Sequence, residues 1–148
     1  MSWEYSEDQL AQKPTVDYLE KVLHWKSVYA FNRETLGPDG LLGRSSERDV
    51  VLTRDLRQAL VRLNPDLPAV AYDEAIRQIT ASSVSKSIVQ ANSEKYGLHK
   101  KGVLVSYRNT QGKREEKRLR LFDFQNPDNN DFLAVRELWV QCGEWGRG

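Results

Sequence analysis

The chain has 148 residues, which is enough for one ordinary domain with a single core but too few for two full domains. A hydrophobic share of 39%, a charged share of 29% and a formal net charge of +1 are typical of globular proteins, without the basic excess of a dedicated nucleic-acid binder. One cysteine, no apolar run near the roughly 20 residues of a membrane span, and no signal-peptide pattern exclude an internal disulfide and predict a cytoplasmic protein without a membrane partner. We expect one domain over residues 1–148.

The N-terminal part of the sequence predicts helix and then strand. Ser6 to Gln9 has the S-x-x-Q form of a capping box, so a helix should begin at Ser6. Pro14 either kinks this helix or opens a second one. Helical spacing of apolar residues predicts a helix from Thr15 to about His24. The aromatic and β-branched stretch from Ser27 to Phe31 predicts a strand.

Turn residues and apolar spacing divide the middle of the chain into a loop and three helices. Glycine, proline and polar residues predict a loop over residues 32–49. The first helix should run from Thr53 to the Asn64-Pro65 stop, and the second should begin at Pro68. The buried side of this second helix is expected to carry Ala71, Ala75, Ile76 and Ile79. The third helix is expected from Ser87 to Leu98, with Gly97 fraying its end.

The C-terminal part changes to strand patterns. Val103, Val105 and Tyr107 alternate with their neighbours, and Asn109 to Gly112 forms a turn into a second strand from Arg114 to Phe124. After a turn at residues 126–130, a third strand is expected from Phe132 to Gln141, with Leu138 and Val140 on one face. Helices followed by antiparallel or mixed strands predict an α+β fold.

Few residues have the pattern of a catalytic or metal site. Two histidines, His24 and His99, and one cysteine are too few for a convincing zinc site, and His99 is interpreted as part of a solvated loop. The sequence contains no G-x-x-x-x-G-K-[ST] phosphate loop, so ATP is not bound by that route. Glu115-Glu116-Lys117 and three Pro-Asp pairs match the Mg²⁺ nuclease pattern only formally. Their turn and loop contexts favour coincidence over a metal site.

One basic cluster is a candidate for phosphate contacts. It consists of Lys113, Arg114, Lys117, Arg118 and Arg120. The alternative is a charged outer face of a hairpin, whose field Glu115 and Glu116 partly offset. From the residues alone, this alternative is favoured.

Collinear segments of the chain resemble one group of type I restriction endonuclease R subunits. They are SEDQL, VLHWKSVYAFN, GPDGLLGR, RQALVRLNPDLP, Ala75 to Thr80, ANSEKYGLHKKGVLVSYRN, and Asp123 to Val140. The resemblance implies a PD-(D/E)xK nuclease domain, followed in the family by an ATP-driven DNA translocase. It also implies partners, the methylation and specificity subunits and double-stranded DNA, and an Mg²⁺- and ATP-dependent break in unmodified foreign DNA.

The sequence departs from the family pattern after Gln141, where it reads CGEWGRG. The Pro-Asp and Glu-x-Lys strands and the translocase motifs of the family would follow this point. We therefore expect an incomplete nuclease domain with no complete metal site, no cofactor bound by this chain and no activity alone. Glu7, in the SED motif, is the candidate for a supporting acid at the metal, or else a helix N-terminal carboxylate.

Two other interpretations remain open for the chain. It is either a non-catalytic module that docks on partners or DNA through the basic hairpin, or the remnant of a disrupted gene. In addition, a missing neighbour strand would leave the edge of the Phe132–Gln141 strand unpaired, which predicts either a homodimer through that edge or partial disorder after Gln141.

Overall fold

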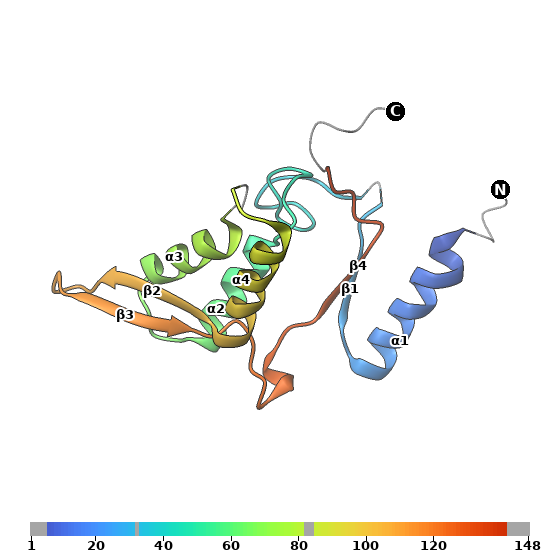
Figure 1. The fold of residues 1–148 in the computed structure, drawn as a ribbon. Helices are drawn as coiled ribbons and strands as arrows, with labels where there is room; N and C mark the ends of the chain where they lie inside the picture. The colour runs from blue at the N-terminus through green and yellow to red at the C-terminus, as the bar shows by residue number, and fades with distance from the viewer. Residues whose placement is uncertain (1–5, 32, 82–84, 142–148) are drawn as a thin grey trace. The chain divides into compact units, whose positions relative to one another are not determined.

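The computed structural model describes residues 6–31, 33–81 and 85–141, and their helices and small sheets confirm the α+β prediction (Figure 1). In chain order the elements are a π-helix at Asp8–Gln12, α1 at Lys13–Leu23, β1 at Lys26–Tyr29, α2 at Thr53–Leu63, α3 at Ala69–Thr80, α4 at Ile88–Lys101, β2 at Val103–Arg108, β3 at Arg114–Leu119, a 3-10 helix at Pro127–Asn129 and β4 at Leu133–Arg136. Among the described helices, none is long and apolar enough to cross a membrane. The PD-(D/E)xK assignment stays a prediction.

Two compact units make up the chain. We call residues 53–130 the hairpin unit, because it contains the β2–β3 hairpin. We call the residues up to Leu52, together with those from Asp131 onward, the strand-pair unit, because they contribute β1 and β4. Each unit is described by itself, and the expected single domain stays a prediction.

In the strand-pair unit, the first helix is continuous but changes its winding before Pro14. The Ser6 hydroxyl accepts a hydrogen bond from Gln9 N at 3.3 Å, which supports the predicted start. The π-helical turn at Asp8–Gln12 then leads into α1, where Pro14 lies in the first turn. Proline lacks an N–H and its ring clashes with the carbonyl four residues earlier, so a wider turn lets the helix continue. His24 ends α1 in the left-handed conformation, at φ 57°.

The two strands of this unit, β1 and β4, pair in parallel although they are far apart in the sequence. Lys26 lies opposite Leu133 and Tyr29 opposite Arg136. The prediction that the last strand reaches Gln141, with Leu138 and Val140 on one face, is wrong because β4 ends at Arg136. The cause is Glu137, whose φ of 53° is incompatible with an extended strand.

A buried arginine organises the predicted loop between β1 and α2. The Arg44 side chain is fully buried and forms a bidentate pair with Glu34, at 2.7 Å from Nε and 2.5 Å from Nη2. It also donates to the backbone oxygens of Glu47, Asp49 and Trp139, at 3.4, 3.1 and 2.9 Å. Arg44 therefore joins this loop to the segment that follows β4.

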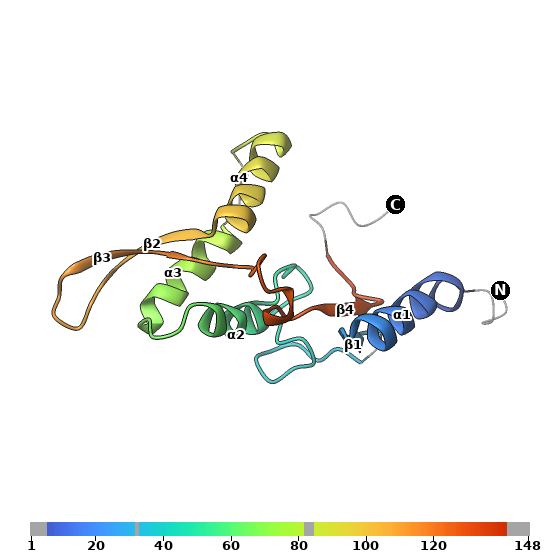
Figure 2. The same cartoon turned by 90° about the horizontal axis from the view of Figure 1, so that it is seen from below.

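The hairpin unit has an apolar core between its helices and one face of the hairpin. The core consists of Leu60, Ala71, Tyr72, Ala75, Ile79, Val103, Val105, Leu119 and Leu121. The prediction for α3 is confirmed at three of its four positions, whereas Ile76 is only partly buried. The hydroxyl of the buried Tyr72 has a hydrogen-bond partner, because it donates to Asn64 O at 2.6 Å. Figure 2 shows β2 and β3 side by side as a two-stranded ribbon.

The predicted ends of α4 and of β3 both differ from the structure. The α4 helix starts next to the predicted Ser87, whose side chain forms a capping box with Gln90, but it continues past Gly97 to Lys101. It ends at Gly102, where φ is 81° and a Cβ atom would lie 2.4 Å from Leu119 O, so only glycine fits. The β3 strand ends at Leu119, because the Asn64 side chain binds both the N–H and the carbonyl of Arg120, at 2.7 and 2.9 Å.

Candidate functional site

The structure distributes the predicted basic cluster over several surfaces of the hairpin unit. Arg114 and Arg118 lie on the same face of β3, because they pair with Arg108 and Leu104 of β2. Lys117 lies opposite the buried Val105, on the face of the sheet that carries the core. The five residues therefore do not form one patch.

The other two residues of the cluster flank β3. Lys113 ends the turn, with its N–H bonded to Asn109 Oδ1 at 3.0 Å. Arg120 follows β3, where its guanidinium donates to Leu63 O at 3.3 Å and lies 3.7 Å from Asp123. Arg120 thus has a structural role at the end of the strand.

A smaller set forms what we call the arginine face, the side of the hairpin opposite the core. It consists of Arg108, Arg114 and Arg118, with Leu104, Ser106 and Glu116 between them, and all six are exposed. Three guanidinium groups and one carboxylate leave an excess of two positive charges. Sequence reasoning missed Arg108, although the turn at residues 109–112 and the alternation of the two strands together place it opposite Arg114.

Hydrogen bonds hold the three guanidinium groups close to the hairpin without burying the arginine residues. Arg114 Nε donates to Ser106 Oγ at 2.7 Å, and its Nη2 lies 3.4 Å from Glu116. Arg108 donates to Gly112 O at 3.1 Å and Arg118 to Gly102 O at 3.3 Å. Each group keeps N–H donors directed to solvent, since a guanidinium has five of them. The arginine face can therefore bind phosphate oxygens.

At the start of the first helix, the acid that is largely buried is Asp8 and not the predicted Glu7. Glu7 precedes the π-helix and is exposed. The Asp8 side chain is only 15% exposed, and its Oδ1 lies 3.3 Å from Arg136 Nε. This contact is an ion pair without hydrogen-bond geometry, so Oδ1 has no hydrogen-bond partner among the described residues. The supporting role proposed for Glu7 stays a prediction.

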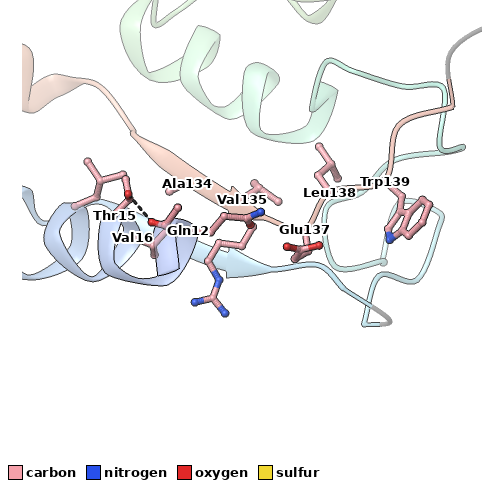
Figure 3. A pocket seen from close by; sticks show the side chains of 11 residues that line it. Gln12, Thr15, Val16, Ala134, Val135, Glu137, Leu138 and Trp139 are labelled. Carbon is pink, nitrogen blue, oxygen red and sulfur yellow. Dashed lines mark hydrogen bonds between the residues drawn. The ribbon is translucent and has the colours of Figure 1, made fainter. Parts of the chain in front are cut away.

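An open groove of about 650 Å³ lies between α1 and β4, next to this ion pair (Figure 3). Figure 3 shows Gln12, Thr15 and Val16 on the helix and Ala134, Val135 and Glu137 on the strand side. The Arg136 guanidinium lies 4.5 Å from the centre of the Tyr29 ring. Because Arg136 is already engaged by Asp8 and Tyr29, the groove has no uncompensated charge from this residue for a ligand to bind.

The formal nuclease motifs lie in positions that do not fit a metal site. Glu115 is exposed on β3, where it accepts hydrogen bonds from the Tyr107 hydroxyl at 3.1 Å and from Asn109 Nδ2 at 2.8 Å. Desolvation, and after it the contact with Glu115, raises the pKa of the Tyr107 hydroxyl. All three Pro-Asp pairs lie outside the strands, as their sequence context predicted. Within the described residues, no three His, Cys, Asp or Glu side chains come together as metal ligands.

Comparison with known proteins identifies the family. Residues 4–147 match the family model "Type I restriction enzyme R protein N terminus (HSDR_N)", and the chain belongs to this family. A curated relative, the "Type I restriction enzyme HindI endonuclease subunit" of Haemophilus influenzae (strain ATCC 51907 / DSM 11121 / KW20 / Rd), is 31% identical over 125 residues. This alignment covers 84% of the chain but 12% of the relative. No solved structure shows a significant match.

The family prediction from sequence is therefore confirmed, and the chain corresponds to the N-terminal region of an R subunit. It spans about an eighth of the length of the relative that it matches.

Proposed function

We propose that this chain acts within a type I restriction enzyme, as part of the R-subunit region that cuts unmodified foreign DNA. The observation that carries the proposal is the family match over residues 4–147. The relative is itself described as an endonuclease subunit, which supports a role in DNA cleavage. In the assembled enzyme the partners are the methylation and specificity subunits and duplex DNA, and the enzyme as a whole uses Mg²⁺ and ATP.

Within that enzyme, the contribution of this chain is DNA contact and scaffolding, and we assign no step of hydrolysis to it. The carboxylate of Glu115 has its own hydrogen bonds on an exposed hairpin, and Asp8 is paired with Arg136. A nuclease Mg²⁺ needs several carboxylate or carbonyl oxygens that converge on one point. Because the two carboxylates named above already have partners of their own, we infer that the chain alone does not cleave DNA.

The inactivity is tested by incubating the purified chain with supercoiled plasmid and Mg²⁺. The expected result is no nicking or linearisation above buffer. Glu7→Gln and Glu115→Gln variants serve as the controls for contaminating nuclease. Cleavage by the wild-type chain that either variant loses would overturn the inference and place a metal-dependent site in this region.

The arginine face is the part of the chain that we propose to contact duplex DNA. Its three guanidinium groups are exposed, and Glu116 is the one carboxylate between them. Arginine binds phosphate through parallel N–H donors, and neutralised phosphates release counterions. The resulting affinity is independent of sequence, as expected when a separate specificity subunit recognises the sequence.

Fluorescence anisotropy with a labelled duplex of about 30 base pairs at low salt tests this role. Arg114→Glu with Arg118→Glu should weaken binding by at least about tenfold and lower the salt slope by about 0.9 for each phosphate that the variant no longer neutralises. Lys21→Glu is the matched control, because this exposed lysine lies on α1 in the other unit. An unchanged duplex affinity in the double variant, with an unchanged circular dichroism spectrum, contradicts the proposal.

A Leu104→Ser variant, compared with the double arginine variant, tests the alternative that the hairpin docks on a protein subunit. Leu104 lies among the arginines and is 48% exposed, which is more typical of a protein contact than of a phosphate contact. If Leu104→Ser abolishes assembly with the other subunits while duplex affinity stays unchanged in both variants, the docking role replaces the DNA role.

A further inference from the structure

A second surface of the hairpin unit has the composition of a ligand pocket. It has a volume of about 440 Å³ and lies between α4 and the segment that follows β3. Its lining residues are Tyr96, His99, Lys100, Phe122 and Phe124, and we call it the aromatic pocket. The sequence interpretation placed His99 in a solvated loop, but it lies in the last turn of α4.

The rings of the aromatic pocket are exposed although they are apolar. Tyr96 is 64% exposed, Phe122 40% and Phe124 69%. The Phe122 and Phe124 centroids are 6.0 Å apart, and His99 meets Phe122 edge-on at 5.7 Å. Clustered exposed aromatic rings are unfavourable in water and mark a binding surface.

A rigid local structure directs the two phenylalanine side chains outward. Asp123 lies between them and is buried, and its carboxylate accepts from Gln125 N, Asn126 N and Asn129 Nδ2 at 3.1, 3.0 and 2.9 Å. These bonds, led by that from Asn129, lower the pKa of the Asp123 carboxyl. Asp123 is 5% exposed, whereas its two neighbours Phe122 and Phe124 are exposed, so the carboxylate and the two rings face different surroundings. The hydrogen bonds of Asp123 fix the backbone between the two rings.

The charge around the aromatic pocket is positive. Lys100 Nζ lies 6.0 Å from the centre of the Tyr96 ring, and Lys101 follows at the end of α4. None of the lining residues is acidic, and Asp123, between the two phenylalanines, is buried and accepts three hydrogen bonds. Cations also suit a helix C-terminus, so the distinguishing feature is their combination with three exposed rings.

We propose that the aromatic pocket binds an unpaired nucleobase of single-stranded DNA. A base would stack on Phe122 and Phe124, and Lys100 would contact the adjacent phosphates. Single-strand binding sites combine these same parts, aromatic platforms and backbone-tracking cations. An apolar protein segment would also cover the rings, but it would gain nothing from the positive charge of Lys100, which lines the pocket beside them. The proposal does not rest on the arginine face, which contacts intact duplex.

The test uses the full chain and a labelled (dT)15 oligonucleotide in low salt. Phe124→Ala should weaken binding by at least about fivefold, since stacking on one aromatic ring makes a contribution of that order. Phe124 is the most exposed ring, so its removal leaves the core intact. Phe124→Trp should retain affinity and show fluorescence quenching when the oligonucleotide is added. Tyr18→Ala is the matched control, because Tyr18 is 57% exposed on α1 in the other unit.

Two results would overturn the proposal. One is no binding of (dT)15 by the wild-type chain, which would leave a protein segment as the occupant. The other is equal affinity for wild-type, Phe124→Ala and Phe122→Ala chains with unchanged circular dichroism. The duplex assay on the same Phe124→Ala variant should show unchanged affinity, so failure of this proposal and failure of the arginine-face proposal are distinguishable.

Discussion

The hairpin unit and the strand-pair unit bury different kinds of side chain. The hairpin unit has a continuous apolar core, in which Leu60, Val103, Val105 and Leu119 are completely shielded. Among the described residues of the strand-pair unit, the largest buried side chain is Arg44, and the buried apolar residues are Val16, Ala30 and Leu42. One unit is therefore stabilised mainly by apolar burial, and the other depends on a buried charge with its hydrogen bonds.

This difference predicts different tolerance to mutation. An apolar core loses stability with the atoms removed and with the cavity that remains after partial relaxation. A buried ion pair is less forgiving, because removal of one partner leaves an uncompensated charge. The strand-pair unit also joins segments from opposite ends of the sequence, so its loss of order is expected to spread from the loop to β1 and β4 together.

Replacement of Arg44 should have the largest effect. Arg44→Ala leaves the largely buried Glu34 carboxylate and three backbone carbonyls without their donor, at a cost of about 3–5 kcal/mol in the unfolding free energy of this unit. Tryptophan fluorescence during urea denaturation measures it, because all four tryptophans of the sequence lie outside residues 53–130.

Two variants sharpen this prediction. Arg48→Ala removes an exposed arginine of the same loop and should change little. Arg44→Lys should recover only part of the stability, since an ammonium group cannot form the bidentate pair with Glu34 and also reach the carbonyls. An Arg44→Ala chain with the wild-type fluorescence midpoint would refute the role given to this residue.

Truncation of a side chain in the core of the hairpin unit should have the next largest effect on stability. Leu60→Ala should lower the unfolding free energy of the hairpin unit by about 3 kcal/mol, because it opens a cavity among fully buried residues. Far-UV circular dichroism measures this loss, because three of the four described α-helices belong to the hairpin unit. Val61→Ala, at a position that is 44% exposed, is the control and should cost much less. Equal losses of unfolding free energy in the two variants would contradict the observation that α2 buries Leu60 and exposes Val61.

Removal of the α4 cap should have a smaller effect. The Ser87 hydroxyl accepts from Gln90 N at 3.2 Å, and Ser87 N donates to Gln90 Oε1 at 3.3 Å. Ser87→Ala should therefore cost about 1 kcal/mol. Ser85→Ala, outside the helix, should cost nothing measurable in the same urea titration. A neutral Ser87→Ala variant would mean that the cap does not contribute to stability.

The smallest effect concerns a surface carboxylate of α3. Hydrogen bonds from Arg77 and then Gln78 lower the pKa of Glu74 from 4.5 to about 2. A lowered pKa means that the stabilisation is fully present above pH 4.5 and is lost as the pH falls from 4.5 toward 2. Glu74→Gln should be slightly less stable than wild type at neutral pH, by less than Ser87→Ala, because solvent screens the pair.

The pH dependence is checked by NMR titration of the Glu74 carboxyl together with stability measurements. In Arg77→Gln the pKa should return toward 4.5. A Glu74→Gln chain that differs from wild type by the same amount at neutral pH and at pH 2 would contradict the assigned cause.

The two units also differ in how much of their structure the sequence predicts. In the hairpin unit, apolar spacing and local turn signals predicted α2, α3, the start of α4 and the hairpin. These features depend on contacts between residues near in sequence. The errors at Lys101 and Leu119 arise from Gly102 and from the side chain of Asn64, which acts from a distant loop.

In the strand-pair unit, the sequence predicted the elements but not their partners. No local pattern indicates that β4 pairs with β1 in parallel, or that Arg44 is buried in a loop rich in glycine and polar residues. The same limit applies to the sites. Resemblance identified the family, but the arginine face and the aromatic pocket depend on strand register and on the inward turn of Asp123.

Hydrogen exchange of the full chain, wild type against Arg44→Ala, tests the contrast between the units most directly. We predict that protection at residues 26–29 and 133–136 falls by about a hundredfold or more, while protection of β2 and β3 stays at the wild-type level. An equal loss of protection in both units, or no loss at β1 and β4, would contradict the conclusion that a buried arginine stabilises one unit and an apolar core the other.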